Sequence, residues 1–175
     1  MSIPRDLFRL NVGFIIHENV GYVRDFPIEI PAVQLPPDLE LKNLSGFVRI
    51  TRAAQGLLVQ VRMNAEVLAE CVRCLVDFYQ PLQVDFTELY AFNRNSATES
   101  GLLVPENGKI DLEAFIREEM LLAIPISPLC SQECQGLCSI CGGNLNETGC
   151  NHTQESGDPR LDILRTLLDE EQNSI

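Results

Sequence analysis

The sequence predicts an α+β fold in which a curved antiparallel sheet of about five strands carries short helices and a C-terminal segment rich in cysteine. Three features of the 175 residues lead to this prediction. Apolar and polar residues alternate over long stretches between residues 22 and 90, a stretch near residue 115 has the helical period, and all cysteines lie within residues 71–74 and 130–150. We expect residues 1–125 to form the sheet domain, and residues 126–175 to form a cysteine-rich segment and a final helix packed on that same domain.

The first elements are predicted to be short. Residues 6–11 fit a short strand and residues 12–18 a short helix, near whose end His17 is expected to be a surface or capping residue. Residues 22–30 alternate loosely and precede Pro31, which predicts a strand that ends there. Residues 35–38 contain two prolines and predict a turn or an extended connector.

The clearest alternation predicts the centre of the sheet. Apolar residues recur at every second position from Leu44 to Ile50, residues 53–56 turn the chain, and a long half-buried strand follows from residue 57 to residue 69. The next strand is predicted over residues 75–90, which places residues 71–74 at the tip of a hairpin. Pro81 lies within that second strand and lacks a backbone donor, so we expect an edge strand or a bulge there.

Two helices are predicted after the sheet. Residues 93–108 are polar and predict a mobile loop, after which Asp111 is expected to cap a helix that ends before Pro125 and Pro128. The apolar face of this helix is formed by Leu112, Phe115, Ile116 and Met120. A last helix is predicted to begin at Asp158 and Pro159. Its apolar stripe, which we expect to dock on the same domain rather than on a partner, consists of Leu161, Leu164, Leu167 and Leu168.

The cysteine spacing points to metal binding. All seven cysteines and one of the two histidines fall into two stretches of the chain. These eight candidate ligands are Cys71, Cys74, Cys130, Cys134, Cys138, Cys141, Cys150 and His152. A Cys-x2-Cys turn brings two thiolates to one ion, and Gly142 directly after such a turn lets the backbone curl towards the sulfurs. Eight soft ligands are the number that two closed tetrahedral zinc sites require.

The spacing also favours one division of the ligands. Cys138, Cys141, Cys150 and His152 make a compact local set, which leaves Cys71 and Cys74 to pair with Cys130 and Cys134 across a long sequence gap. Swapped pairings, such as both Cys-x2-Cys knuckles on one ion, stay open. We favour two structural zinc ions, because a set made only of soft ligands leaves no open coordination position.

Other uses of the cysteines are less well supported. Disulfides need an oxidising compartment, and residues 1–6 show neither the basic nor the apolar region of a secretory signal. A thioredoxin-like motif would open a helix with Cys-x-x-Cys, whereas Cys71 stands between two predicted strands. The spacing alone leaves an iron–sulfur cluster open.

Charge limits the classes of partner. The net charge of −12 argues against free binding to a phosphate backbone, and it favours a basic protein partner or simple solubility. No apolar run approaches the length that spans a membrane, and no glycine-rich phosphate loop is present. The acidic pair Glu118 and Glu119 fits a solvated helix face, since no nucleophile accompanies it. The sequence therefore predicts no enzyme.

The chain resembles the YceD family, also called DUF177, which is named for large ribosomal RNA subunit accumulation. The match rests on the knuckle Cys71-Val72-Arg73-Cys74, on residues 110–112 and 121–125, on the block from Cys130 to Asn146, and on residues 158–160. Residues 10–12 and Gly21 also fit the opening of the family.

The resemblance implies a non-catalytic role in large-subunit biogenesis in bacteria or plastids. Many relatives have cysteine where His152 stands, and some keep the Cys-x-Arg-Cys knuckle without the set from Cys138 to His152, which supports two separate sites. The family gene often neighbours that of a small basic zinc-binding protein of the large subunit. We therefore expect a zinc-binding factor of the cytoplasm, or of the plastid stroma in a plant, that supports 23S ribosomal RNA accumulation through ribosomal proteins or assembly intermediates.

Two other functions are compatible with the residues. A direct ribosomal RNA-binding module would use a local basic strip near the knuckle, with Arg49, Arg52, Arg62 and Arg73 on one face of the sheet. Arg73 would otherwise offset the negative charge of a thiolate–zinc site. A thiol redox protein would need a reactive thiolate of low pKa.

Overall fold

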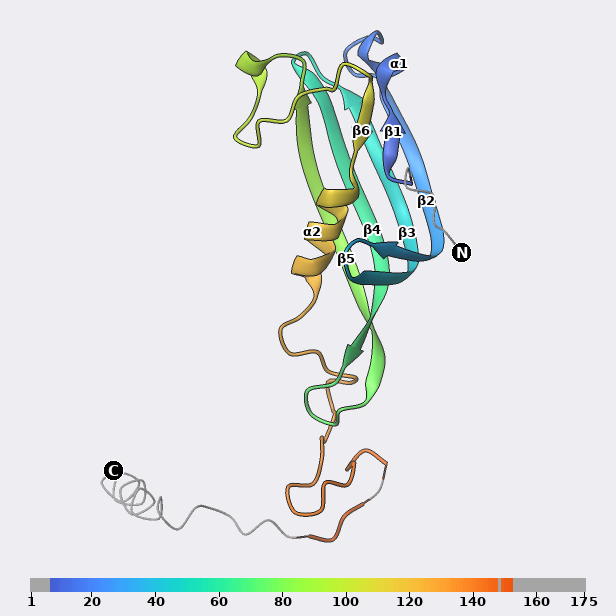
Figure 1. Ribbon diagram of the computed structural model, residues 1–175, viewed down its shortest axis with the longest axis vertical. Helices are drawn as coiled ribbons and strands as arrows, with labels where there is room; N and C mark the ends of the chain where they lie inside the picture. Colours follow the sequence, from blue (N-terminus) through green and yellow to red (C-terminus); the bar gives the residue numbers. More distant parts are fainter. Residues whose placement is uncertain (1–6, 148, 153–175) are drawn as a thin grey trace, which may run out of the picture.

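The computed structural model describes residues 7–147 and 149–152, and within them it has two antiparallel sheets (Figure 1). The large sheet has the order β2-β3-β4-β5, and the small sheet pairs β1 with β6. The strands are β1 (Arg9–Asn11), β2 (Val23–Leu35), β3 (Leu39–Arg52), β4 (Gly56–Glu70), β5 (Asp77–Ala91) and β6 (Lys109–Asp111). The helices are α1 (Gly13–Ile16), the single 3-10 turn η1 (Arg94–Ser96) and α2 (Glu113–Ala123). The predicted antiparallel α+β architecture is confirmed, and the last helix predicted from Asp158 lies outside the described residues.

The β4–β5 hairpin is the longest regular unit of the sheet. The two strands pair without interruption from Gly56 opposite Ala91 to Glu70 opposite Asp77. The predicted alternation of β4 is confirmed, since its apolar residues at odd positions from Leu57 to Val67 are buried. Residues 71–74 therefore lie at the hairpin tip, at the opposite end of the elongated sheet from α1 (Figure 1).

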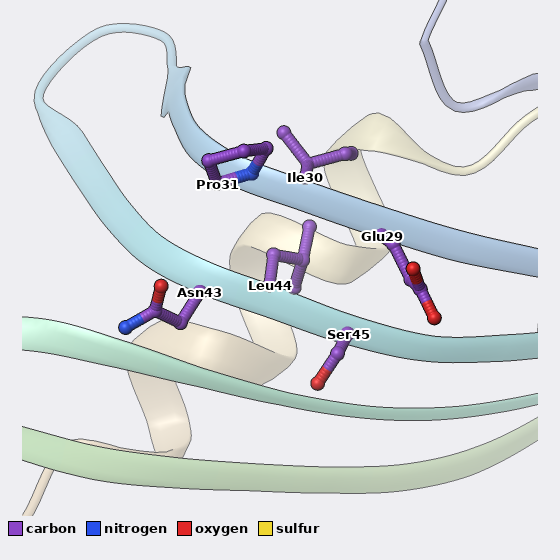
Figure 2. A pocket seen from close by; sticks show the side chains of 6 residues that line it. All are labelled: Glu29, Ile30, Pro31, Asn43, Leu44 and Ser45. Carbon is purple, nitrogen blue, oxygen red and sulfur yellow. The ribbon is translucent and has the colours of Figure 1, made fainter.

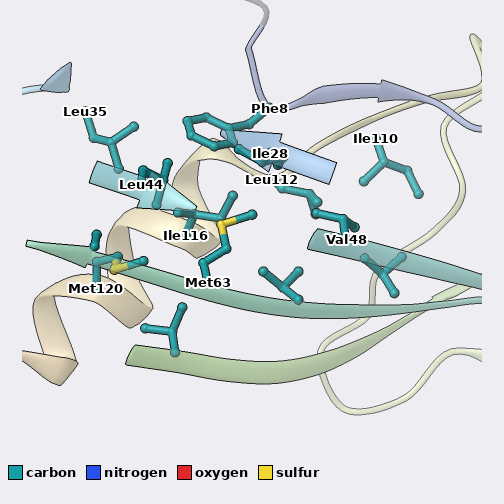
Figure 3. Close-up of a cluster of buried hydrophobic side chains, with 14 of the residues drawn as sticks. Phe8, Ile28, Leu35, Leu44, Val48, Met63, Ile110, Leu112, Ile116 and Met120 are labelled. Atoms are coloured by element: carbon teal, nitrogen blue, oxygen red, sulfur yellow. The ribbon is translucent and has the colours of Figure 1, made fainter. Parts of the chain in front are cut away.

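The core fills the space between one face of the large sheet and the elements that cover it. Figure 3 shows Ile116 and Met120 of α2 beside Met63 of β4, with Phe8 and Ile110 from the region of the small sheet in the same cluster. Ile116 and Met120 are fully buried. Burial of a side chain of this size stabilises the folded state by about 2 kcal/mol. Among the described residues, the other face of the large sheet is open to solvent, with Arg62, Asn64 and Leu68 of β4 exposed on it.

Sheet edges decide where the prolines fit. The predicted end of a strand at Pro31 is wrong, because β2 continues through Pro27 and Pro31 to Leu35. β2 is an edge strand, and an edge strand can lack backbone donors on its outer side without losing sheet hydrogen bonds. The edge predicted at Pro81 is confirmed, since β5 is the opposite edge. The predicted turn at residues 35–38 joins β2 to β3.

The short elements differ from their predicted bounds. The N-cap of α2 is Leu112 rather than Asp111, because Asp111 pairs with Arg9 as the last residue of β6 and stays extended. The Asp111 carboxylate still accepts a hydrogen bond from the Glu113 N–H at 3.0 Å. The predicted helix over residues 12–18 is limited to α1, with His17 exposed at its C-cap, as expected for a surface histidine.

Candidate metal centres

The first candidate centre lies at the β4–β5 tip. Cys71 and Cys74 come from the hairpin turn, and Cys130 and Cys134 from the segment that follows α2. The four sulfur atoms all lie within 4.8 Å of one another. Cys71 Sγ is 3.8 Å from Cys134 Sγ, and Cys74 Sγ is 3.6 Å from Cys130 Sγ. Of the four residues, all but Cys130 are buried.

The second candidate centre is formed by residues close in sequence. Cys138, Cys141, Cys150 and His152 also place their ligand atoms within 4.8 Å of one another. Cys141 Sγ is 3.8 Å from Cys150 Sγ, which is 3.3 Å from Cys138 Sγ and 2.7 Å from His152 Nδ1. The structure therefore brings together the two sets that the spacing favours, and it places the two Cys-x2-Cys knuckles in different groups.

Two sulfur separations of the first group, 3.6 and 3.8 Å, match the shell of one tetrahedral ion. A Zn–S distance of about 2.3 Å with tetrahedral angles places two sulfurs about 3.8 Å apart. A disulfide would bring them to about 2.05 Å. All seven cysteines are free thiols. The first group thus has the donor atoms and the spacing to hold a metal ion. The second group has the donor atoms within 4.8 Å of one another, and two of its separations, 3.3 and 2.7 Å, are shorter than in such a shell.

The two Cys-x2-Cys turns share one backbone conformation. The Leu75 N–H donates to Cys71 O at 2.9 Å, and the Gly142 N–H donates to Cys138 O at 2.8 Å. The residue after each turn is left-handed, with φ of 58° at Leu75 and 71° at Gly142. Glycine adopts this conformation freely, whereas a left-handed leucine costs about 1–2 kcal/mol. Sequence reasoning found the need for Gly142 but gave no sign of the same need at Leu75.

The pKa values of the thiols show why a bound cation would be needed for all of them to ionise. Backbone hydrogen bonding at Cys130 holds the pKa of the Cys71 thiol at about 6, and backbone hydrogen bonding at Cys141 and Ile140 does the same for Cys138. Hydrogen bonding with Cys74 raises the pKa of Cys130 to about 12. Adjacent negative charges disfavour one another, so a group of thiols this close ionises fully only around a cation.

Arg73 joins the hairpin tip to the cysteine-rich segment. Its Nη1 donates to Cys134 O at 3.0 Å, and its carbonyl oxygen accepts a hydrogen bond from the Leu137 N–H at 3.1 Å. Gly136 lies against this link with φ of 79°, and a Cβ there would be 3.1 Å from Arg73 O. Arg73 thus contributes to the architecture of the first centre.

Asn146 connects the two centres and was missed by sequence reasoning. It stands between the candidate ligands Cys141 and Cys150, yet its Nδ2 lies 3.4 Å from Cys134 Sγ of the other group. Its Oδ1 accepts a hydrogen bond from the Gln135 N–H at 2.8 Å. No rule of ligand spacing identifies such an amide, because it acts on a sulfur that belongs to a different set.

The four arginines proposed as a basic strip do not gather on one face. Arg49 forms a two-point ion pair with Asp25, and Arg62 lies 2.8 Å from Asp85, both on the open face of the sheet. Arg52 lies on the opposite face of the sheet from Arg49 and Arg62, and its guanidinium stacks 4.3 Å from the Phe92 ring centroid. Arg73 is at the hairpin tip. This part of the RNA-binding hypothesis is wrong, because Arg52 lies on the face of the sheet opposite to that of Arg49 and Arg62, and Arg73 lies outside the strands.

A hollow on the sheet offers no catalytic arrangement. Figure 2 shows the side chains that line this hollow of about 430 Å³ where β2 meets β3. They are Glu29, Ile30, Pro31, Asn43, Leu44 and Ser45. Glu29 and Ser45 are cross-strand neighbours, but no hydrogen bond joins their side chains, so the hollow shows no nucleophile bonded to a base. Within the described residues, no helix is long and apolar enough to span a membrane.

Comparison with known proteins finds a matching protein family. The profile of "Large ribosomal RNA subunit accumulation protein YceD" matches residues 59–168. An uncharacterized protein of Mycobacterium tuberculosis is 33% identical over 168 residues, covering 93% of this chain and 77% of the relative. The uncharacterized protein YlbN of Bacillus subtilis is 29% identical, covering 64% of this chain and 66% of YlbN.

A plant relative has a descriptive name. "Large ribosomal RNA subunit accumulation protein YCED homolog 1, chloroplastic" of Arabidopsis thaliana is 35% identical over 68 residues, which are 39% of this chain and 21% of the plant protein. No solved structure was found to match the chain.

Proposed function

Because this chain belongs to the YceD family of large ribosomal RNA subunit accumulation proteins, we propose that it is a non-catalytic zinc-binding factor that supports 23S ribosomal RNA accumulation and large-subunit biogenesis. The observation that carries the proposal is the family match, which spans the β4–β5 hairpin and both cysteine groups. The factor would act in the cytoplasm, where bacterial ribosomes assemble, and through contacts with ribosomal proteins or assembly intermediates.

We propose zinc as the metal and one structural ion in each group. Residues 71, 74, 130 and 134 would hold one ion, and residues 138, 141, 150 and 152 the other. Sulfur separations of 3.6–3.8 Å in the first group suit one ion, whereas a cluster of several iron atoms holds its cysteines further apart. Bound zinc would offset part of the negative charge of the thiolates. It would also tie residues 126–152 to the sheet domain, proposed to end at residue 125.

A catalytic thiol is the weaker alternative. A redox cysteine combines a low pKa with access for its substrate. Cys71 and Cys138 have the lowered pKa but exposed fractions of only 0% and 8%, so a disulfide substrate has little access to either sulfur. Alkylation tests this reading, since metal-bound thiolates should resist a thiol reagent until a chelator is added.

Asn146→Ala is expected to weaken metal binding at the first centre. The substitution removes the amide that lies 3.4 Å from Cys134 Sγ, and loss of a hydrogen bond to a metal ligand lowers metal affinity by about 10–100-fold. Competition of the purified protein with a chromophoric zinc chelator measures the affinity. Gln132→Ala, an exposed amide between Cys130 and Cys134, is the matched control and should leave the affinity unchanged. Equal affinities of Asn146→Ala and Gln132→Ala would show that Asn146 does not support the centre.

Affinity purification tests the proposed function. The tagged chain, isolated from gently lysed cells at moderate salt, is expected to retain large-subunit precursor RNA or basic large-subunit proteins. RNase treatment before elution should leave the proteins bound if contact is made through protein. Depletion of the chain is expected to lower 23S ribosomal RNA relative to 16S. Recovery of neither component, together with an unchanged RNA ratio, would refute the role in large-subunit biogenesis.

A further inference from the structure

The open face of the large sheet carries an acidic and apolar surface at its hairpin end. Strand pairing places Leu68 of β4 opposite Tyr79 of β5, with Glu70 opposite Asp77 one step nearer the tip and Lys42 of β3 opposite Glu66 one step farther away. We name this surface the tip patch. It consists of Glu40, Lys42, Glu66, Leu68, Glu70, Asp77 and Tyr79.

The centre of the tip patch is apolar and accessible. The exposed fraction is 59% for Leu68 and 45% for Tyr79, although the two are large apolar side chains in direct cross-strand register. A hollow of about 70 Å³ lies beside them, lined also by Glu40 and Lys42. Exposed apolar residues that adjoin one another, unlike single scattered ones, mark interaction surfaces.

The border of the tip patch is strongly negative. Its four carboxylates face a single cation, Lys42, which gives the seven residues a net charge of −3. Lys42 is held 4.5 Å from the Tyr79 ring centroid and donates a hydrogen bond to the Tyr79 hydroxyl. The Glu66 carboxylate accepts a hydrogen bond from Asn43 at 2.9 Å, so its position is fixed.

We propose that the tip patch binds a lysine- or arginine-rich segment of a partner protein, with a large apolar side chain of that segment against Leu68 and Tyr79. The carboxylates would attract its cations, and the exposed apolar pair would be removed from water. The identification of this partner as a large-subunit protein rests on the proposed function, whereas the binding chemistry does not.

Charge favours a basic protein segment over two other possible occupants of the tip patch. A nucleic acid would bring phosphates against four carboxylates, which opposes binding. The chain's own residues 153–175 carry six carboxylates and two arginines, so their net charge of −4 has the same sign as the tip patch. A basic protein segment is the occupant with complementary charge.

Lys42 gives the proposal a distinctive consequence. It already occupies the Tyr79 ring face that a cation of the partner would use. Its removal should therefore strengthen binding, because it repels the incoming cations and covers the ring. Lys109, in β6 at the other end of the molecule (Figure 1), provides a lysine whose removal changes the net charge equally.

Fluorescence anisotropy with the full zinc-loaded chain tests the proposal. The probe is a labelled synthetic peptide that alternates lysine with phenylalanine. Glu70→Lys with Asp77→Lys is expected to lower its affinity about tenfold, whereas Glu99→Lys with Glu106→Lys, an equal charge change in an exposed loop, should have little effect. Leu68→Ser with Tyr79→Ser should also lower the affinity. Lys42→Ala should raise it about threefold, and Lys109→Ala should not.

Specific results would contradict the proposal that the tip patch binds a basic protein segment. Equal losses in the two double charge reversals would mean that only net charge attracts the peptide. Tighter binding of a labelled single-stranded RNA, lost on replacement of Leu68 and Tyr79, would mean that the surface serves RNA. A parallel binding assay with RNA-free large-subunit proteins separates the two proposals. If the wild type and both double charge reversals retain these proteins equally, the tip patch is not their binding site. If the wild type retains none of them, large-subunit proteins are not the partner, and the peptide result still stands.

Discussion

Replacement of Cys74 with serine is expected to remove one zinc ion per chain and to unfold the hairpin tip together with its attachment to residues 129–137. Serine keeps the size of the side chain but supplies no thiolate. Structural zinc sites contribute on the order of 10 kcal/mol, which is comparable to the stability of a whole domain. The small cluster at the tip consists of Cys71, Cys74 and Cys134 with Phe78, Leu129 and Leu137 packed against it, so little apolar burial would hold the tip without metal.

The loss should be confined to that end of the molecule. The main hydrophobic cluster lies between the sheet and α2 and includes none of the cysteines. Amide exchange of Cys74→Ser is therefore expected to rise at the tip and in residues 129–137 but to stay low in the centre of β4. Zinc content by mass spectrometry and the melting temperature complete the measurement, and treatment of the wild type with a chelator should reproduce the change.

Val72→Ser is the matched control for Cys74→Ser. Val72 is exposed in the same turn and supplies no ligand atom, so the variant should keep its zinc and its melting temperature. A Cys74→Ser protein with the zinc content and melting temperature of Val72→Ser would refute the assignment of Cys74 as a ligand.

Gly46→Ala is expected to destabilise the sheet by about 3 kcal/mol, the upper end of the usual cost of overpacking a protein interior. A Cβ on Gly46 would lie 2.1 Å from Arg62 O and 2.8 Å from Met63 Cα. Both contacts are to the backbone of β4, which is held between β3 and β5 and cannot move aside. The residue also has φ of 154°, which follows the register shift between Lys42 and Ser45 and is unfavourable for a side chain.

Urea unfolding measures this effect, with Gly101→Ala as the control. Gly101 has φ of 63° but no atom within 4 Å of an added Cβ, so alanine there should cost only the conformational strain of about 1 kcal/mol. If Gly46→Ala lost no more stability than Gly101→Ala, the close approach of β3 to β4 at this position would be disproved.

The sequence alone determined the features that depend on local periodicity and local spacing. Alternation over residues 57–69 identified β4, because each strand residue turns its side chain to the face opposite that of its neighbour. The following alternation located β5 and hence the hairpin tip at residues 71–74. Ligand spacing favoured the two cysteine groups that the structure brings together, because one of them closes locally, and it left swapped pairings open.

Only the tertiary structure decided the features that depend on pairing between distant segments. The edge position of β2 admits Pro31, and the pairing of β1 with β6 moves the start of α2 past Asp111. Arg49 pairs with Asp25 and Arg62 with Asp85 on neighbouring strands, and Asn146 reaches a sulfur of the other cysteine set. Residue type and spacing do not identify these partners. Hydrogen bonds, ion pairs and close backbone contacts depend on which strands and loops become neighbours when the chain folds.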